Sequence, residues 1–174
     1  MTGNFRTSAA AMSAAAFLLL ASSSVASADG RADWNGYAWQ RIDMADCLPV
    51  GSILHCPPYH EKWDWKRNQW VDIVLELDLA GGKLHLFQRL STRDPRDVDW
   101  VCVTAVAVDA SGSNVVVHHQ NWLMGPGDVT QDQFSYRSPA VGTVAAIHVG
   151  SKQCRDGAHQ DDALYEQVLA GIQP

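Results

Sequence analysis

The sequence predicts a mainly β fold: a small antiparallel β-sandwich or open barrel with one C-terminal α-helix, stapled by disulfides. Three observations lead to this prediction. Between residues 71 and 150, short runs of apolar or alternating side chains are separated by turns rich in glycine, proline and aspartate. No helical pattern lies between these runs, which disfavours a parallel α/β sheet. The chain also contains four cysteines, an even number.

The N-terminal segment, residues 1–28, has the pattern of a secretory signal peptide. Arg6 and the α-amino group give it a weakly positive start, and residues 9–21 are apolar or small. Ala26-Ser27-Ala28 then provides the small residues of a cleavage site, so we expect a mature chain over residues 29–174. The apolar run is shorter than the about 20 residues of a membrane span, and no later segment reaches that length. We therefore expect a secreted or periplasmic protein.

The mature chain is predicted to be a single domain with a sheet core over residues 71–150. Residues 71–78 alternate between apolar and polar side chains, as in a half-buried strand. The glycine pair Gly81-Gly82 predicts the turn of a hairpin. Residues 100–108 form an almost continuous apolar run, typical of a central strand covered on both faces. Further strands are expected over residues 83–90, 114–122, 133–137 and 141–150.

The two ends of the mature chain differ from this core. Residues 29–70 are rich in Trp, Pro, Tyr and His and are expected to be irregular. Residues 159–172 predict a C-terminal helix, because Asp161 can cap it and its apolar residues share one face. That face consists of Leu164, Tyr165, Val168, Leu169 and Ile172.

The charge balance excludes some partners. The chain has 13 basic and 19 acidic residues and a net charge of −6. Nucleic acids and anionic membranes are bound through basic faces, so neither is expected as a partner.

The cysteine pattern predicts two disulfides in an oxidising compartment. Four cysteines allow three pairings, and we favour Cys47 with Cys56 and Cys102 with Cys154. The first pair closes a short loop and the second joins distant segments. The CxxC spacing of redox and zinc sites is absent, so these cysteines are interpreted as structural.

Tryptophan is the most unusual feature of the composition. The chain has seven tryptophans, all after the signal peptide. Three of them lie in the stretch 63–70 with polar neighbours suited to sugar hydroxyl groups, and indole rings suit the apolar faces of sugars. The alternative is that these rings supply buried area to a core poor in phenylalanine. The candidate ligand-binding residues are Trp63, Asp64, Trp65, Arg67 and Trp70.

No motif predicts a catalytic, metal or cofactor site. His85, His148 and either His118 or His119 lie in predicted strands that could be neighbours, but no HxH or HExxH spacing accompanies them. No G-x-S-x-G elbow surrounds a serine. The carboxylates of the Trp-rich zone could serve a hydrolase, but nothing selects a pair among Asp43, Asp46, Glu61 and Asp64.

These observations lead us to expect an exported, non-enzymatic binding domain whose partner is a polysaccharide or a protein. Recognition usually lies on loops and surfaces carried by a rigid sheet. One alternative is a small secreted hydrolase that uses His and carboxylate side chains of the Trp-rich zone. Another is a structural envelope protein without a ligand. The oligomeric state is left open.

Overall fold

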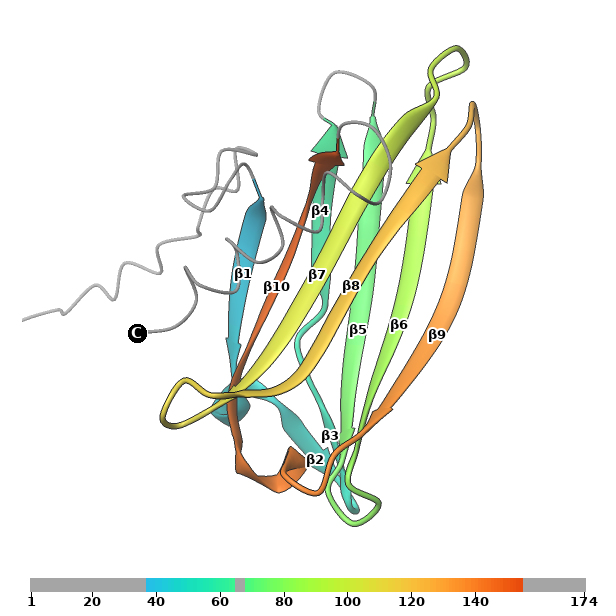
Figure 1. Ribbon diagram of the computed structural model, residues 1–174. Coiled ribbons are helices and arrows are strands. Elements are labelled where there is room, and N and C mark those ends of the chain that lie inside the picture. Colours follow the sequence, from blue (N-terminus) through green and yellow to red (C-terminus); the bar gives the residue numbers. More distant parts are fainter. Residues whose placement is uncertain (1–36, 65–67, 155–174) are drawn as a thin grey trace, which may run out of the picture.

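Ten β-strands and two short 3₁₀ helices make up the described part of the protein, residues 37–64 and 68–154 of a computed structural model (Figure 1). Every strand pairing is antiparallel. The elements are β1 (Ala38–Asp43), η1 (Met44–Asp46), β2 (Leu48–Val50), β3 (Ile53–His55), β4 (Tyr59–Asp64), β5 (Gln69–Asp78), β6 (Lys83–Thr92), β7 (Asp99–Asp109), β8 (Asn114–Met124), β9 (Val129–Arg137), η2 (Val141–Thr143) and β10 (Val144–Cys154).

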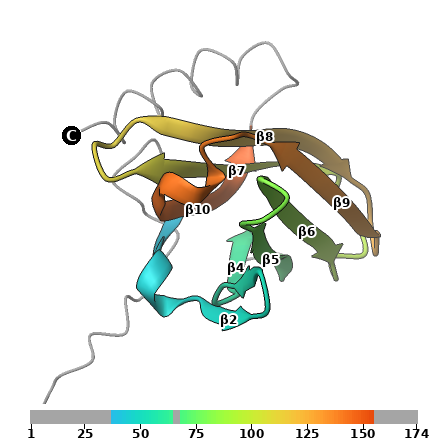
Figure 2. The ribbon, with the colours of Figure 1, turned by 90° about the horizontal axis from the view of Figure 1, so that it is seen from below.

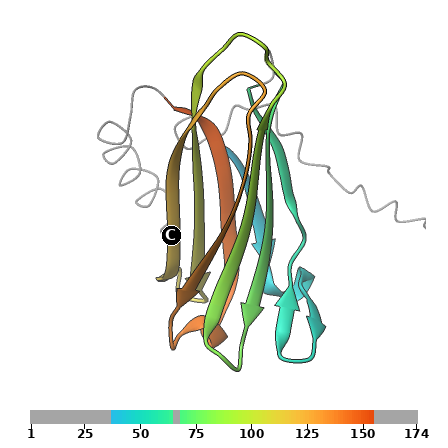
Figure 3. The same ribbon diagram turned by 90° about the vertical axis from the view of Figure 1, so that its right-hand side faces the viewer.

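The strands form two sheets that lie face to face (Figure 2). The four-stranded sheet has the order β1-β10-β7-β8, and the six-stranded sheet has the order β2-β3-β5-β6-β9. The short strands β3 and β4 both pair with β5, β3 near its end and β4 near its beginning. Figure 3 shows the two layers from the side, with the β2–β3 hairpin at one end. The prediction of a mainly β, antiparallel fold is therefore confirmed.

The core lies between the sheets and follows the alternation in the sequence. Val71, Ile73, Leu75 and Leu77 of β5 are all buried and face the other sheet. A fully buried side chain of this kind stabilises the fold by about 1.5–3 kcal/mol. The polar residues between them face outward, so the expected half-buried strand is present.

A second, smaller apolar cluster lies on the outer face of the four-stranded sheet. It contains Cys102, Val106 and Val108 of β7, together with Tyr37. Its presence explains why the run over residues 100–108 is apolar on both faces. Gly150 lets the Trp39 ring lie against the same sheet, since a Cβ atom there would come within 2.6 Å of that ring.

Both expected disulfides are present. Cys47 and Cys56 lie at the open end of the β2–β3 hairpin, immediately before and after its strands, and their bridge closes it. The Cys102–Cys154 bridge links neighbouring strands β7 and β10 and spans 52 positions of the sequence. The long-range bridge thus belongs to the outer apolar cluster.

Several boundaries differ from the sequence-based expectation. Four short strands, β1 to β4, occupy part of the zone expected to be irregular, because three-residue strands such as β2 and β3 are too short to show a period. Strand β9 begins at Val129, four residues before the expected start. The alternation did not predict these residues because the inward positions Thr130 and Asp132 are polar.

Two expected elements cannot be compared with the structure. The signal peptide over residues 1–28 and the helix over residues 159–172 lie outside the described residues. Residues 37–64 and 68–154 contain no α-helix, and the structure gives no support to the predicted C-terminal helix. In that same part of the chain, no helix is long and apolar enough to cross a membrane.

Candidate functional site

A row of polar side chains crosses the outer face of the six-stranded sheet. The register places His60 of β4, Asp72 of β5, Arg89 of β6 and Gln131 of β9 next to one another in turn. The His60 imidazole Nδ1 contacts the Asp72 carboxylate, and the Arg89 Nη1 donates to the other oxygen of that carboxylate at 3.1 Å. Asp72 is therefore held between two basic side chains and keeps a defined position on the face.

A groove of about 480 Å³ lies beside this row. Its apolar residues are Val74, which is 41% exposed, and Phe87, its partner across β5 and β6. Polar side chains surround them on three strands. The complete lining consists of Asp72, Val74, Phe87, Gln88, Arg89, Gln131, Asp132 and Gln133.

Trp70 extends the same face beyond the groove. Its indole ring stacks on the His60 ring at a centroid distance of 4.5 Å, and the Lys62 ammonium lies 4.8 Å from its centroid. The indole N–H donates to the Asn68 side-chain oxygen at 2.9 Å. The ring is half-buried and fixed at its edge, so it forms a rigid continuation of the row.

Trp63 does not join this face, which corrects the expectation of a shared tryptophan surface. Its ring is 6% exposed and lies in the core between the sheets. The cause is the period of β4, in which Tyr59 and Trp63 both point inward. Asp64 ends the same strand, and Trp65 and Arg67 lie outside the described residues.

The candidate carboxylates are not brought together. Glu61 is half-buried, and burial is the main cause that raises its pKa. Glu61 directly follows His60 in β4, and consecutive side chains of a strand point to opposite faces of the sheet, so the two side chains do not meet. Asp43 accepts a hydrogen bond from the Arg41 guanidinium at 2.8 Å, and Asp46 lies in η1.

The histidines are likewise dispersed. His85 bonds to the Ser135 hydroxyl at 2.7 Å on the outer face of the six-stranded sheet, whereas His118 lies between the sheets. His118 and His119 point to opposite faces of β8, as the strand prediction requires. Among the described residues, no three His, Cys, Asp or Glu side chains are grouped so that they could hold a metal ion.

A polar zone lies in the interior at the margin between β8 and β9. Gln88 is 2% exposed, and neither atom of its amide group has a hydrogen-bond partner among the described residues. His118 bonds to the Tyr136 hydroxyl and packs against the Phe134 ring. Burial, followed by the charge of neighbouring His119, lowers the pKa of His118 to about 4.

The groove residues were missing from the sequence-based candidates. The alternation over residues 71–78 places Asp72 on the outward face of its strand, but no sequence signal selects Phe87, Arg89, Gln131 or Gln133 as binding residues. The signal that could have found them is the hairpin register, because pairing across Gly81-Gly82 already places Asp72 opposite Arg89. The pairing of β6 with β9 has no comparable signal in the sequence.

Comparisons with known proteins add little to this geometry. No family model matches the chain, and no curated protein matches it. A DUF1425 family member from Shewanella sp. pv-4 is 9% identical with a TM-score of 0.36, covering 64% of this chain and 98% of that chain. A chain of the T13 IBDV viral particle is 13% identical with a TM-score of 0.35, covering 70% of this chain and 27% of that chain. Neither likeness assigns a function.

Proposed function

We propose that the protein is an exported, non-enzymatic binding domain that takes a polysaccharide on the outer face of its six-stranded sheet. The observation that carries this proposal is the groove beside Asp72 and Arg89, with Phe87 and Val74 as its apolar residues. Binding sites of this kind combine an apolar surface with a few fixed polar groups. The expected signal peptide and the two disulfides support export to an oxidising compartment.

Sugar chemistry matches the side chains that line the groove. A pyranose ring has an apolar C–H face that packs on an aromatic ring such as Phe87. Its hydroxyl groups both donate and accept hydrogen bonds, which suits the Asp72 carboxylate, the Arg89 guanidinium and the amides of Gln131 and Gln133. Trp70 lies on the same face, but its indole ring is already contacted by His60 and Lys62, so the proposed aromatic contact is with Phe87.

The geometry favours binding over hydrolysis. The His60–Asp72 pair resembles part of a catalytic arrangement, but Arg89 already engages the second oxygen of Asp72. Glu61, the half-buried carboxylate with a raised pKa, leaves the other side of β4. A glycosidase needs two carboxyl groups that face the same bond, about 5–9.5 Å apart.

Binding can be measured by titrating the purified mature protein with a panel of soluble cell-wall and plant polysaccharides in a calorimeter. We expect at least one polysaccharide to bind with millimolar or tighter affinity per repeat unit. Phe87→Ala and Arg89→Ala should each weaken that binding at least tenfold, because they remove the aromatic contact and the guanidinium donor. The substrate should be recovered with its chain length unchanged.

Leu123→Ala is the matched control, since Leu123 is an exposed apolar residue on the other sheet. It should leave the affinity unchanged. Absence of binding across the whole panel would refute the polysaccharide proposal and favour a protein partner or a structural role. A shortened polysaccharide would instead favour the hydrolase.

A further inference from the structure

Among residues 37–64 and 68–154, the far side of β9 is a free sheet edge. The amide of Thr92 donates to the Asp128 carbonyl at 2.9 Å and the amide of Ser138 donates to the Gly82 carbonyl at 3.0 Å, one bond at each end of the β6–β9 ladder. Hydrogen-bonded pairs alternate along an antiparallel ladder. The even-numbered residues of β9 therefore bond to β6, and the odd-numbered residues point their N–H and C=O groups away from it. Within the described chain, no strand pairs with that side.

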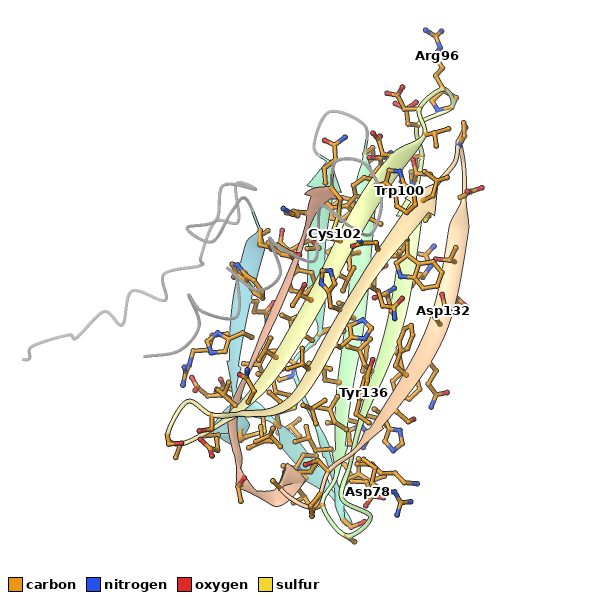
Figure 4. All side chains as sticks on the ribbon, in the orientation of Figure 1. Asp78, Arg96, Trp100, Cys102, Asp132 and Tyr136 are labelled. Carbon is orange, nitrogen blue, oxygen red and sulfur yellow. A yellow bond between two sulfur atoms is a disulfide. The ribbon has the colours of Figure 1, made fainter. Side chains whose placement is uncertain are left out.

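This edge lacks proline, glycine, lysine and any register irregularity, and Asp132 is its one inward-pointing charge. β9 is 9 residues long. Its outward odd-numbered positions are uncharged except for Arg137 at the end, and Val129 at the other end is 55% exposed. Exposed, regular edges of this kind are templates for a further strand. Figure 4 labels two residues of this strand, Asp132 nearer the β8–β9 loop and Tyr136 nearer the other end.

The apolar core is also less completely covered beside β9, between β8 and β9. Phe134 and Tyr136 of β9 and Trp122 of β8 are only partly buried, although all three pack against the main apolar cluster. A strand added beside β9 would remove more of this aromatic surface from water, which stabilises the added pairing by about 25 cal/mol per Å².

We propose that the occupant of this edge is a second copy of the same chain, paired antiparallel through β9 about a twofold axis at Gln133. In this register Gln133 meets Gln133 of the second copy, Gln131 meets Ser135, and Val129 meets Arg137. All of these are odd-numbered residues, so every pair can exchange backbone hydrogen bonds. The sequence of the strand is thus complementary to itself in one register.

The charges agree with this register. Asp132 is the one acidic residue of β9; it lies opposite Phe134 of the second copy and diagonal to its own equivalent, two residues further along, at about 7–8 Å. Arg137 lies opposite Val129 of the second copy, so it faces no charged residue there. Pairing therefore brings no like charges directly opposite each other.

The dimer would join the two six-stranded sheets into one continuous sheet. Gln131 and Gln133 line the groove on the outer face, so the two grooves would lie on the same face on either side of the twofold axis. The inference does not depend on the proposed polysaccharide, because the edge and its register involve only β9.

Cysteine cross-linking tests the register directly. All four native cysteines are in disulfides, so an introduced cysteine is the only free thiol. Gln133→Cys should form an intermolecular disulfide under mild oxidation, because facing Cα atoms of a hydrogen-bonded pair are about 5.5 Å apart. Gln131→Cys alone and Ser135→Cys alone should not, since each is displaced from its equivalent by four residues, about 13 Å. An equal mixture of these two variants should cross-link.

Sedimentation equilibrium gives a second, independent readout. The mature wild-type protein should be dimeric at high micromolar concentration, and Gln133→Pro should raise the dimer dissociation constant at least tenfold. Proline is tolerated at an edge position whose N–H faces outward, so circular dichroism should show an unchanged fold. A wild-type monomer at these concentrations, or equal cross-linking at positions 131 and 133, would overturn the proposal.

Discussion

His118 of β8 and Tyr136 of β9 join the two sheets through a hydrogen bond of 2.6 Å between the imidazole Nδ1 and the phenol oxygen. The imidazole is 1% exposed, so a positive charge on it would have no access to water. Burial is the main reason that the pKa of His118 is lowered to about 4, and it also raises the pKa of Tyr136. Burial therefore keeps both side chains neutral near pH 7.

Acid should destabilise the protein through His118. The ordinary histidine pKa is 6.5, so between pH 6.5 and about 4 the unfolded chain binds a proton that the folded chain does not. The free energy of unfolding should fall as the pH falls through this window, by on the order of 3 kcal/mol from His118 alone. Urea unfolding at a series of pH values measures this slope.

Two variants distinguish the effect of burial on the His118 pKa from the effect of its hydrogen bond to Tyr136. His118→Phe removes the titrating group and should flatten the slope between pH 6.5 and 4. Tyr136→Phe removes the hydrogen bond but leaves the imidazole buried, so it should retain the slope. A His118→Phe variant with the wild-type slope would show that other groups cause the acid sensitivity, and the pKa of His148, also lowered mainly by burial, would be the first to consider.

The tryptophans of β4 and β5 should differ in their effect on stability. Trp63 lies in the core, so Trp63→Ala should cost about 3–5 kcal/mol. Trp70 lies on the outer face, and Trp70→Ala should cost about 1 kcal/mol. Urea unfolding measures both. Similar losses for the two variants would contradict the assignment of the two rings to opposite faces.

The sheet core could be predicted where one face of a strand is entirely apolar. Val71, Ile73, Leu75 and Leu77 show this pattern, and the strand and its buried face agree with the prediction. β9 could be predicted only in part. Thr130, one of its inward residues, is polar, so apolar and polar side chains do not alternate at the start of the strand. The strands before residue 65 are short, and their position depends on pairing with distant parts of the chain.

The candidate site was less predictable than the fold. Composition drew attention to Trp63 and Trp70, but it could not say that they leave opposite faces of the sheet. The groove depends on Arg89 and Gln131 being neighbours, which follows from the β6–β9 pairing and from no local pattern. A pair of residues that meet only through sheet topology cannot be recognised before the strand order is known.

Two buried glutamines should respond in opposite ways to the same substitution. The Gln88 amide has no hydrogen-bond partner among the described residues, and a buried polar group without partners costs about 1–3 kcal/mol. Gln88→Leu should therefore raise the free energy of unfolding by a similar amount. Gln69 instead donates to Thr92 at 3.2 Å and to Asp99 at 3.1 Å, so Gln69→Leu should lower it.

Thermal unfolding of both variants beside the wild type provides the comparison. A loss of stability in Gln88→Leu as large as that in Gln69→Leu would mean that the Gln88 amide is satisfied by an ordered water molecule or a bound ligand.

The two disulfides should contribute unequally to stability. Cys102 and Cys154 are separated by 52 positions, against 9 for Cys47 and Cys56. A bridge that closes a longer loop removes more conformational entropy from the unfolded chain. The long bridge also belongs to the apolar cluster on the outer face of the four-stranded sheet, where Cys102 is fully buried. The double variant Cys102→Ala/Cys154→Ala should therefore lose more stability than Cys47→Ala/Cys56→Ala, by on the order of 1–2 kcal/mol.

Peptide mapping of the oxidised wild-type protein checks the pairing, and urea unfolding of the two double variants gives the difference. Each variant keeps one bridge, so each serves as the control for the other. The short bridge holds only the β2–β3 hairpin, at one edge of the six-stranded sheet, so its loss should leave the rest of the sheet paired. Equal losses, or a larger loss without the short bridge, would show that this hairpin contributes more to the fold than its edge position suggests. A peptide linking Cys47 to Cys102 would contradict the placement of β10 beside β7.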